Sequence, residues 1–205
     1  MDLSLEDLDA LDVALESADL GGVEVDVADR VAAATFRVLT LPPEGPEPED
    51  RRVQFLFEPV GRVAASLRLG RWDDAGAAIQ PFGLDELLPT VQSFQGQRIY
   101  GGRMHGGEFF DPPETKFQAL AGRLSCDVSL GADGRSHSLF LFQEAQDRIL
   151  DLWLWFDRLE IRDPLGRVIP LAEFVAGGRR WWDALHRHDP RTQGHGIYSL
   201  APRLQ

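Results

Sequence analysis

The segment YGGRMHGGEFFDPP, residues 100–113, has the residue types and spacing most typical of a binding loop. Four glycines within seven positions surround His105. Glycine lets a backbone approach a ligand closely, and functional residues favour loops held on a rigid scaffold. We therefore expect Tyr100, Arg103, His105 and Glu108 to be the binding residues if this loop is a site. His105 and Glu108 are the candidates for general acid–base catalysis.

The same loop has a simpler interpretation as a glycine-rich bulge or hairpin loop with a surface histidine. One histidine and one glutamate fall short of the three protein ligands that are typical of catalytic zinc. The sequence also lacks the H-x-H pattern with a downstream glutamate that cupin-type barrels use. We therefore expect no metal and no cofactor at this loop.

A second candidate is RILDLWLWFDRLEI, residues 148–161, whose strict alternation predicts a β-strand. Trp153 and Trp155 lie on the same face as the carboxylates of Asp151 and Asp157, so this face can be a ligand platform. The two carboxylates are about 20 Å apart on a strand, too far for the acid–base pair of a glycosidase. Such a mechanism would need a carboxylate from another strand.

The apolar residues of this segment change faces near Asp157, which predicts a β-bulge or a strong twist there. A strand that is apolar on both faces is most simply a central strand covered on both sides. We therefore favour Trp153 and Trp155 as packing residues beneath a C-terminal helix that contains RRWW, residues 179–182.

The other reactive side chains have structural interpretations. His186 and His188 suit a helix C-terminus, where the helix dipole favours a cation, and His195 follows in an extended tail. Cys126 alternates with leucines and valine, which predicts a core position. No nucleophile elbow, P-loop or dinucleotide-binding motif occurs. The sequence thus favours a protein that is not an enzyme.

The charge of the chain is concentrated at one end. The first 50 residues hold 14 acidic side chains and two arginines, so they alone carry the whole net charge of −12. No cluster of basic residues offers a phosphate-binding surface, which makes nucleic acid an unsuitable partner. A basic protein surface is the more suitable partner, although an acidic terminus can also serve solubility alone.

The hydrophobic pattern predicts the order of the elements. Residues 3–16 can form an amphipathic helix with Ser4 as N-cap and Asp7 three positions later, or else a frayed acidic leader. Three β-hairpins are expected at residues 23–41, at 51–69 around EPVG, and at 122–145 around Asp133-Gly134. A helix is expected near 171–186, weakened at its centre by Gly177-Gly178.

These elements predict a mainly β fold with short connections, and therefore with antiparallel pairing. We expect an antiparallel β-sandwich or flattened barrel, with one α-helix near 171–186 packed on the sheet. A strongly curved sheet with the helix on one face is the close alternative. Residues 1–20 are expected to form an acidic N-terminal segment and residues 21–205 a single β-rich domain.

The sequence points to the cytoplasm. A single cysteine fits a reducing compartment, and the acidic N-terminus lacks the basic region of a secretory signal. No apolar run approaches the length that crosses a bilayer.

Three functions are compatible with these patterns. The first is a non-enzymatic protein-interaction module with an acidic N-terminal surface, of the inhibitor or immunity type. The second is a binding protein for small molecules or carbohydrates, or a hydrolase, that uses the glycine-rich loop at 100–108. The third is a module whose apolar face is completed by another chain. The charge layout favours the first.

Overall fold

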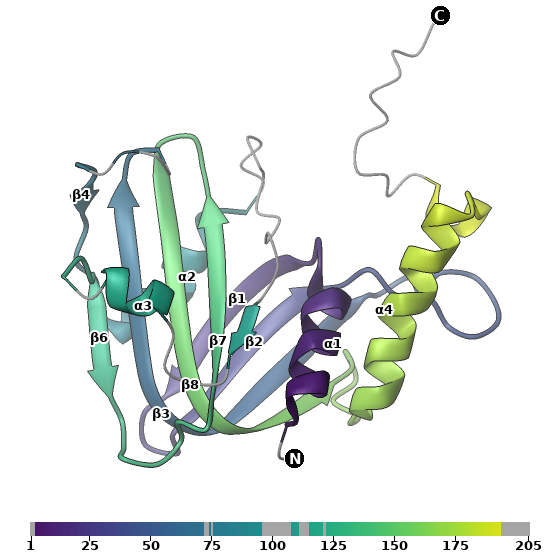
Figure 1. Ribbon diagram of the computed structural model, residues 1–205, viewed down its shortest axis with the longest axis horizontal. Coiled ribbons are helices and arrows are strands. Elements are labelled where there is room, and N and C mark those ends of the chain that lie inside the picture. The colour runs from purple at the N-terminus through teal and green to yellow at the C-terminus, as the bar shows by residue number, and fades with distance from the viewer. Residues whose placement is uncertain are drawn as a thin grey trace, which may run out of the picture.

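The computed structural model describes residues 3–71, 74, 76–95, 108–110, 115–120 and 122–193. Figure 1 shows one strongly curved sheet with helices packed around it. The helices are α1 (Leu5–Leu15), α2 (Leu87–Gln92), α3 (Thr115–Leu120) and α4 (Leu171–His186). The strands are β1 (Asp19–Asp26), β2 (Val31–Arg37), β3 (Arg52–Leu69), β4 (Ala78–Ile79), β5 (Glu108–Phe110), β6 (Cys126–Ser129), β7 (His137–Glu144) and β8 (Arg148–Arg162).

All strand pairs are antiparallel, as the short connections predict. The strand order is β1-β2-β3-β8-β7-β5, with β4 and β6 paired to the second half of β3. The mainly β, antiparallel class is therefore confirmed. Among the strands that the structure describes, the sheet is not closed into a barrel.

The two longest strands, β3 and β8, pair along almost their whole length and bend together (Figure 1). At the bend Gly61 is an extra residue on β3, between Val60 opposite Phe156 and Arg62 opposite Trp155. The core-facing series on β8 shifts from even to odd positions between Phe156 and Leu159. The predicted irregularity near Asp157 is thus confirmed, with the bulge itself on the neighbouring strand. The bend folds the sheet over on itself, as in an orthogonal sandwich.

Two of the three predicted hairpins are wrong because local turn signals do not determine pairing. The EPVG segment lies inside the single strand β3, since β8 pairs with it on both sides of the bend. The strands around Asp133-Gly134 exist, but β6 pairs with β3 and β7 pairs with β5 and β8. The loop between β6 and β7 crosses over the bend, where the backbone of Gly61 forms hydrogen bonds with the backbone of Leu130 and Gly134. The first hairpin, β1–β2, is confirmed.

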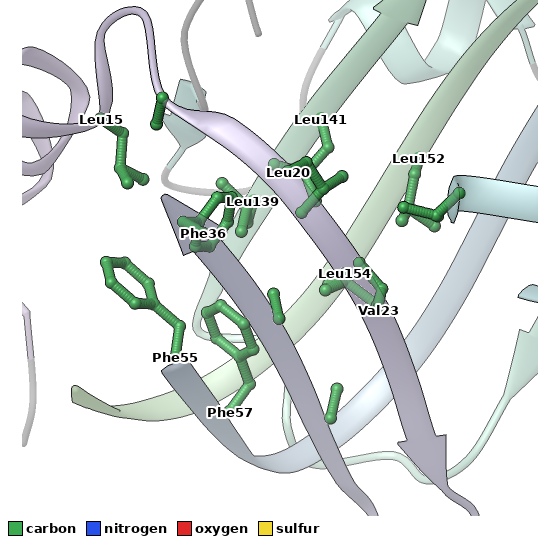
Figure 2. Close-up of a cluster of buried hydrophobic side chains, with 14 of the residues drawn as sticks. Leu15, Leu20, Val23, Phe36, Phe55, Phe57, Leu139, Leu141, Leu152 and Leu154 are labelled. Atoms are coloured by element: carbon green, nitrogen blue, oxygen red, sulfur yellow. The ribbon is translucent and has the colours of Figure 1, made fainter. Parts of the chain in front are cut away.

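The main core fills the space between the two halves of the folded sheet. Figure 2 shows side chains from the two halves meeting across this space. One half contributes Leu20, Val23, Phe36, Phe55 and Phe57, and the other contributes Leu139, Leu141, Leu152 and Leu154. The aromatic rings stack edge to face or tilted, with Phe36 and Phe55 at 5.1 Å and Phe57 and Phe156 at 4.7 Å between centroids.

Helix α1 begins as its sequence predicts. The Ser4 hydroxyl accepts a hydrogen bond from the backbone N–H of Asp7, and the Asp7 carboxylate accepts one from the N–H of Ser4. Leu8, Leu11 and Leu15 are buried in the main core. This docking stabilises a helix that would be marginal in isolation, so the alternative of a frayed leader is wrong.

Helix α4 confirms the predicted C-terminal helix. Leu171, Phe174 and Val175 join the main core, and the Phe174 ring lies 5.3 Å from that of Phe55. Its two central glycines are explained by close neighbours. A Cβ at Gly177 would collide with Thr40 Oγ1, and one at Gly178 would lie 2.9 Å from Ala14 Cα on α1. The glycines let α4 pack tightly against both segments.

Replacing Gly178 by alanine should therefore destabilise the protein. Alanine stabilises a helix by about 1 kcal/mol relative to glycine. Here, however, its Cβ would collide with the backbone of Ala14, which cannot rotate away as a side chain could. We expect Gly178→Ala to lower the free energy of unfolding by about 1–3 kcal/mol in urea titrations. Gly122→Ala is the control, because a Cβ there has no neighbour within 4 Å. A Gly178→Ala variant more stable than the wild type would contradict the close packing of α1 and α4.

Candidate functional site

Most of the predicted loop site lies outside the residues that the structure describes. This is so for Tyr100, Arg103 and His105. Glu108 is the first residue of β5, where it pairs with Phe140 of β7, and its side chain is not among those described. Phe140 in turn pairs with Trp153 of β8. The structure thus brings the end of the glycine-rich segment to the same row of the sheet as the first tryptophan.

The two tryptophans are packing residues, but not beneath the helix that we expected. Trp153 is fully buried and Trp155 is 7% exposed. The ring of Phe117 on α3 lies 5.6 Å from Trp153 and 4.8 Å from Trp155, edge to face with both. The prediction that the RRWW helix covers them is wrong, because this face of β8 lies outside the main core that α4 joins.

The tryptophans of α4 form a separate cluster. Trp181 is fully buried with Leu41 and Ala184, and its ring meets that of Trp182 at 4.9 Å, edge to face. Trp181 is therefore a core residue of this cluster, whereas Trp182 is partly exposed. Trp153, Trp155 and Trp181 are buried, so none of these three offers the open ring face that a sugar-binding platform needs.

A buried ion pair lies close to Trp153 on the face of the sheet that points away from the main core, here called the outer face. Arg68 on β3 and Asp151 on β8 are 9% and 4% exposed, and Arg68 Nη2 donates to Asp151 Oδ2 at 2.5 Å. Within the described residues, Arg68 Nε is buried without a hydrogen-bond partner. Burial raises the pKa of Asp151, although the charges of Arg68 and Arg123 oppose the rise. Sequence reasoning placed Asp151 on this face but missed Arg68, whose pairing depends on the β3–β8 register.

Asp157 has a structural role at the bend. Its carboxylate accepts hydrogen bonds from the backbone N–H groups of Gly134, Arg135 and Ser136 and from the Ser136 hydroxyl. Burial raises the pKa of Asp157, but these hydrogen bonds outweigh it and the net pKa lies below the ordinary value. The carboxylate therefore holds the crossing loop on β8.

A shallow pocket of about 530 Å³ lies beside Asp157 and is lined by Ser136 and His137 among others. Three residue types of a catalytic triad thus meet there. However, the Ser136 hydroxyl donates to Asp157 at 2.8 Å, and no hydrogen bond joins it to His137 among the described residues. A serine activated as a nucleophile donates to its base. The pocket lacks that arrangement.

The remaining candidates match their structural interpretations. Cys126 is buried against the main core, and burial together with the charge of Asp127 raises the pKa of its thiol. His186 is the last residue of α4, and His188 follows the C-cap with a positive φ of 57°. His195 lies outside the described residues. Within the described part of the chain, no group of three or more His, Cys, Asp or Glu side chains could hold a metal ion.

A groove of about 770 Å³ lies between α1 and α4. Figure 1 shows the two helices side by side, with the N-terminal end of each at the bottom. Its lining residues from α1 are Glu6, Asp7 and Ala10, and those from α4 and the residue before it are Pro170, Leu171, Ala172, Val175, Ala176, Arg179, Arg180 and Asp183. The floor is apolar and the rim is charged. Sequence reasoning missed this groove because it depends on contact between elements far apart in the chain.

The charges on the groove rim are unequal. Glu6, Asp7 and Asp183 supply carboxylates. Hydrogen bonds from Ser4 lower the pKa of Asp7, which keeps its carboxylate ionised. Arg180 donates to Glu173 at 2.7 Å and to the Leu41 carbonyl, so its charge is compensated. Arg179 offsets one of the three carboxylates, so the rim keeps a small excess of negative charge.

No helix in the described part of the chain is long and apolar enough to span a membrane. No known family model matches this sequence, and no match to it was found among the curated proteins or the solved structures.

Proposed function

We propose that this chain is a non-enzymatic protein-interaction module that binds a basic partner protein through the acidic surface of α1. The observation that carries the proposal is the position of α1. The helix is docked on the body by its leucines, and Glu6, Asp9 and Glu16 are exposed. A folded helix presents these carboxylates in a defined pattern, which a frayed leader would not do.

The charge distribution of the whole chain supports this function. The first 50 residues, which include α1, have a net charge of −12, while the remaining 155 residues are neutral overall. A strongly one-sided charge accelerates the encounter with a partner of opposite charge and disfavours partners of like charge. An inhibitor or immunity-type protein that neutralises a basic partner fits this layout. A cytoplasmic location fits the single cysteine.

Reversing two charges on α1 tests the proposal. Glu6→Lys/Asp9→Lys should weaken partner binding by about tenfold or more at physiological salt, because it replaces attraction by repulsion. Proteins captured from the native host by the wild type would be identified, purified and titrated against each variant. Asp85→Lys/Asp147→Lys is the matched control, since it changes the net charge equally at exposed carboxylates outside the first 50 residues.

The expected results are a loss of affinity in the α1 variant only and a wild-type affinity that falls as salt rises. Equal affinity of the α1 variant and the control for every captured protein would contradict the proposed function.

A second candidate function, a small-molecule binding protein, is favoured by one observation. Strand pairing places Glu108 beside Phe140 in the row of the sheet that contains Trp153, and Asp151 and Ser66 form a neighbouring pair on the same face. A sugar bound there would perturb the tryptophan emission. Titration with a panel of mono- and disaccharides would be followed by fluorescence in the wild type and in Glu108→Ala. A saturable change that Glu108→Ala abolishes would support this function, and no change with any sugar would contradict it.

A further inference from the structure

We propose that the groove between α1 and α4 is the docking site for an amphipathic helix of the partner, whose polar side carries lysines or arginines. This inference rests on the proposed function and names both the binding site and the class of partner. The shape of the groove, the backbone that lines it and the charges on its rim all favour such a helix.

The walls of the groove suit a third helix. Helices α1 and α4 meet at Ala14 and Gly178, where a Cβ on the glycine would touch α1. Small side chains line the groove beside this contact, namely Ala10 on α1 with Ala172 and Ala176 on α4. Small residues allow an incoming helix to approach to the 8–10 Å axis separation of packed helices. The small exposed parts of Leu171 and Val175, which are otherwise buried in the main core, make the bottom of the groove apolar.

The backbone around the groove excludes a strand as the occupant. A bound strand gains affinity mainly by pairing its backbone with the free edge of a sheet. Among the described residues, the groove is lined by two helices and the proline that precedes α4, and no strand contributes to it. Helix backbones satisfy their own hydrogen bonds internally, so recognition here depends on side chains. The helix-in-groove mode of peptide recognition fits this arrangement.

The rim selects the charge of the occupant. Helix α1 contributes Glu6 and Asp7 on one side, and Asp183 lies on the α4 side. Arg180 is neutralised by Glu173, which leaves Arg179 as the one cation of the lining without a described ion pair. A helix with lysines or arginines flanking its apolar face therefore meets complementary charge, whereas an acidic helix meets repulsion.

A synthetic peptide can test the groove before the natural partner is known. The peptide is about 18 residues long, with leucines at i, i+3, i+4 and i+7 and lysines on the other face. A second peptide carries glutamates in place of the lysines. Binding to the full chain is measured by fluorescence anisotropy at about 0.15 M salt. We expect the lysine peptide to bind at least about tenfold more tightly than the glutamate peptide.

Filling the groove should abolish this binding without changing any charge. Ala176→Phe and Ala10→Phe place a ring in the groove from opposite walls and should each weaken binding of the lysine peptide by about tenfold or more. Val13→Phe is the control, because Val13 is 44% exposed on α1 but does not line the groove. The affinity of Val13→Phe for the lysine peptide should stay within about twofold of that of the wild type. Thermal unfolding would establish that the variants are folded.

The outcomes separate this inference from the proposed function. If Glu6→Lys/Asp9→Lys weakens peptide binding but both groove-filling variants bind like Val13→Phe, the acidic surface binds and the groove does not. That result would overturn the inference alone. If the charge-reversed variant also binds the lysine peptide and the captured partner normally, both proposals are wrong.

Discussion

Replacing Asp151 by alanine is expected to lower the free energy of unfolding by about 3–5 kcal/mol. The substitution removes the carboxylate that accepts from Arg68 and leaves a guanidinium 9% exposed with no counter-ion in the pair. An unpaired buried charge is costly because the interior solvates it poorly. Urea-induced unfolding at neutral pH, followed by tryptophan fluorescence, would measure the loss, since Trp153 is buried two positions from Asp151 on the same face of β8.

The double variant Arg68→Met/Asp151→Leu should recover most of this loss. Burial raises the pKa of Asp151 even beside Arg68, so the attraction between the two charges does not fully offset the free-energy cost of burying them. Apolar residues of similar volume often replace such a pair at little or no cost. We expect the double variant to fall within about 1–2 kcal/mol of the wild type. A double variant as unstable as Asp151→Ala would mean that the pair stabilises the fold by more than charge compensation.

The elements of this fold were predictable wherever the signal is local. The capping residues Ser4 and Asp7 and the alternation of residues 148–161 identified α1 and β8, because capping and face alternation depend on neighbours within a few positions. The shift of apolar residues between the faces of β8 also revealed the bend. These features need no knowledge of distant segments.

The pairing of the strands was not predictable from local signals. Pro59 and Gly61 have the composition of a hairpin turn, yet they lie in a bend of one strand. The difference depends on β8, which follows almost 80 residues later and pairs on both sides of the bend. A turn signal establishes that the chain changes direction, and only the partner strand determines by how much.

The same limit applies to the candidate sites. The alternating pattern placed Trp153 and Trp155 on a covered face. It could not identify α3 as the element that covers them, because Phe117 reaches them through tertiary packing. The groove between α1 and α4 joins residues more than 150 positions apart. Its one local signal was Gly177-Gly178, a pair that weakens a helix and therefore indicates a close neighbour.

Replacing Asp157 by asparagine should destabilise the protein by about 2–3 kcal/mol at neutral pH. The carboxylate accepts from three consecutive backbone N–H groups, of Gly134, Arg135 and Ser136, at 2.9–3.0 Å. An amide side chain offers one oxygen and no charge, so it cannot replace all of these charge-assisted hydrogen bonds. The crossing loop between β6 and β7 would then lose its attachment to β8 at the bend.

The cost of Asp157→Asn should shrink in acid. The pKa of Asp157 in the folded protein lies below the ordinary value of 3.8, so its contribution is complete above that pH and is lost as the pH falls through 3.8 toward the folded pKa. The wild type and the variant should therefore converge in stability below about pH 4. Urea titrations at a series of pH values between 7 and 3 would follow the difference.

Ser136→Ala is the control for this behaviour, because it removes one hydroxyl donor and keeps the carboxylate with its backbone partners. Its cost should be near 1 kcal/mol, the usual net contribution of one hydrogen bond. A difference between the wild type and Asp157→Asn that stays constant down to pH 3 would show that the charge of Asp157 does not stabilise the crossing loop. That loop carries the chain from β6 beside β3 to β7 beside β8, so the carboxylate of Asp157 stabilises the crossover between the two sides of the β3–β8 pair.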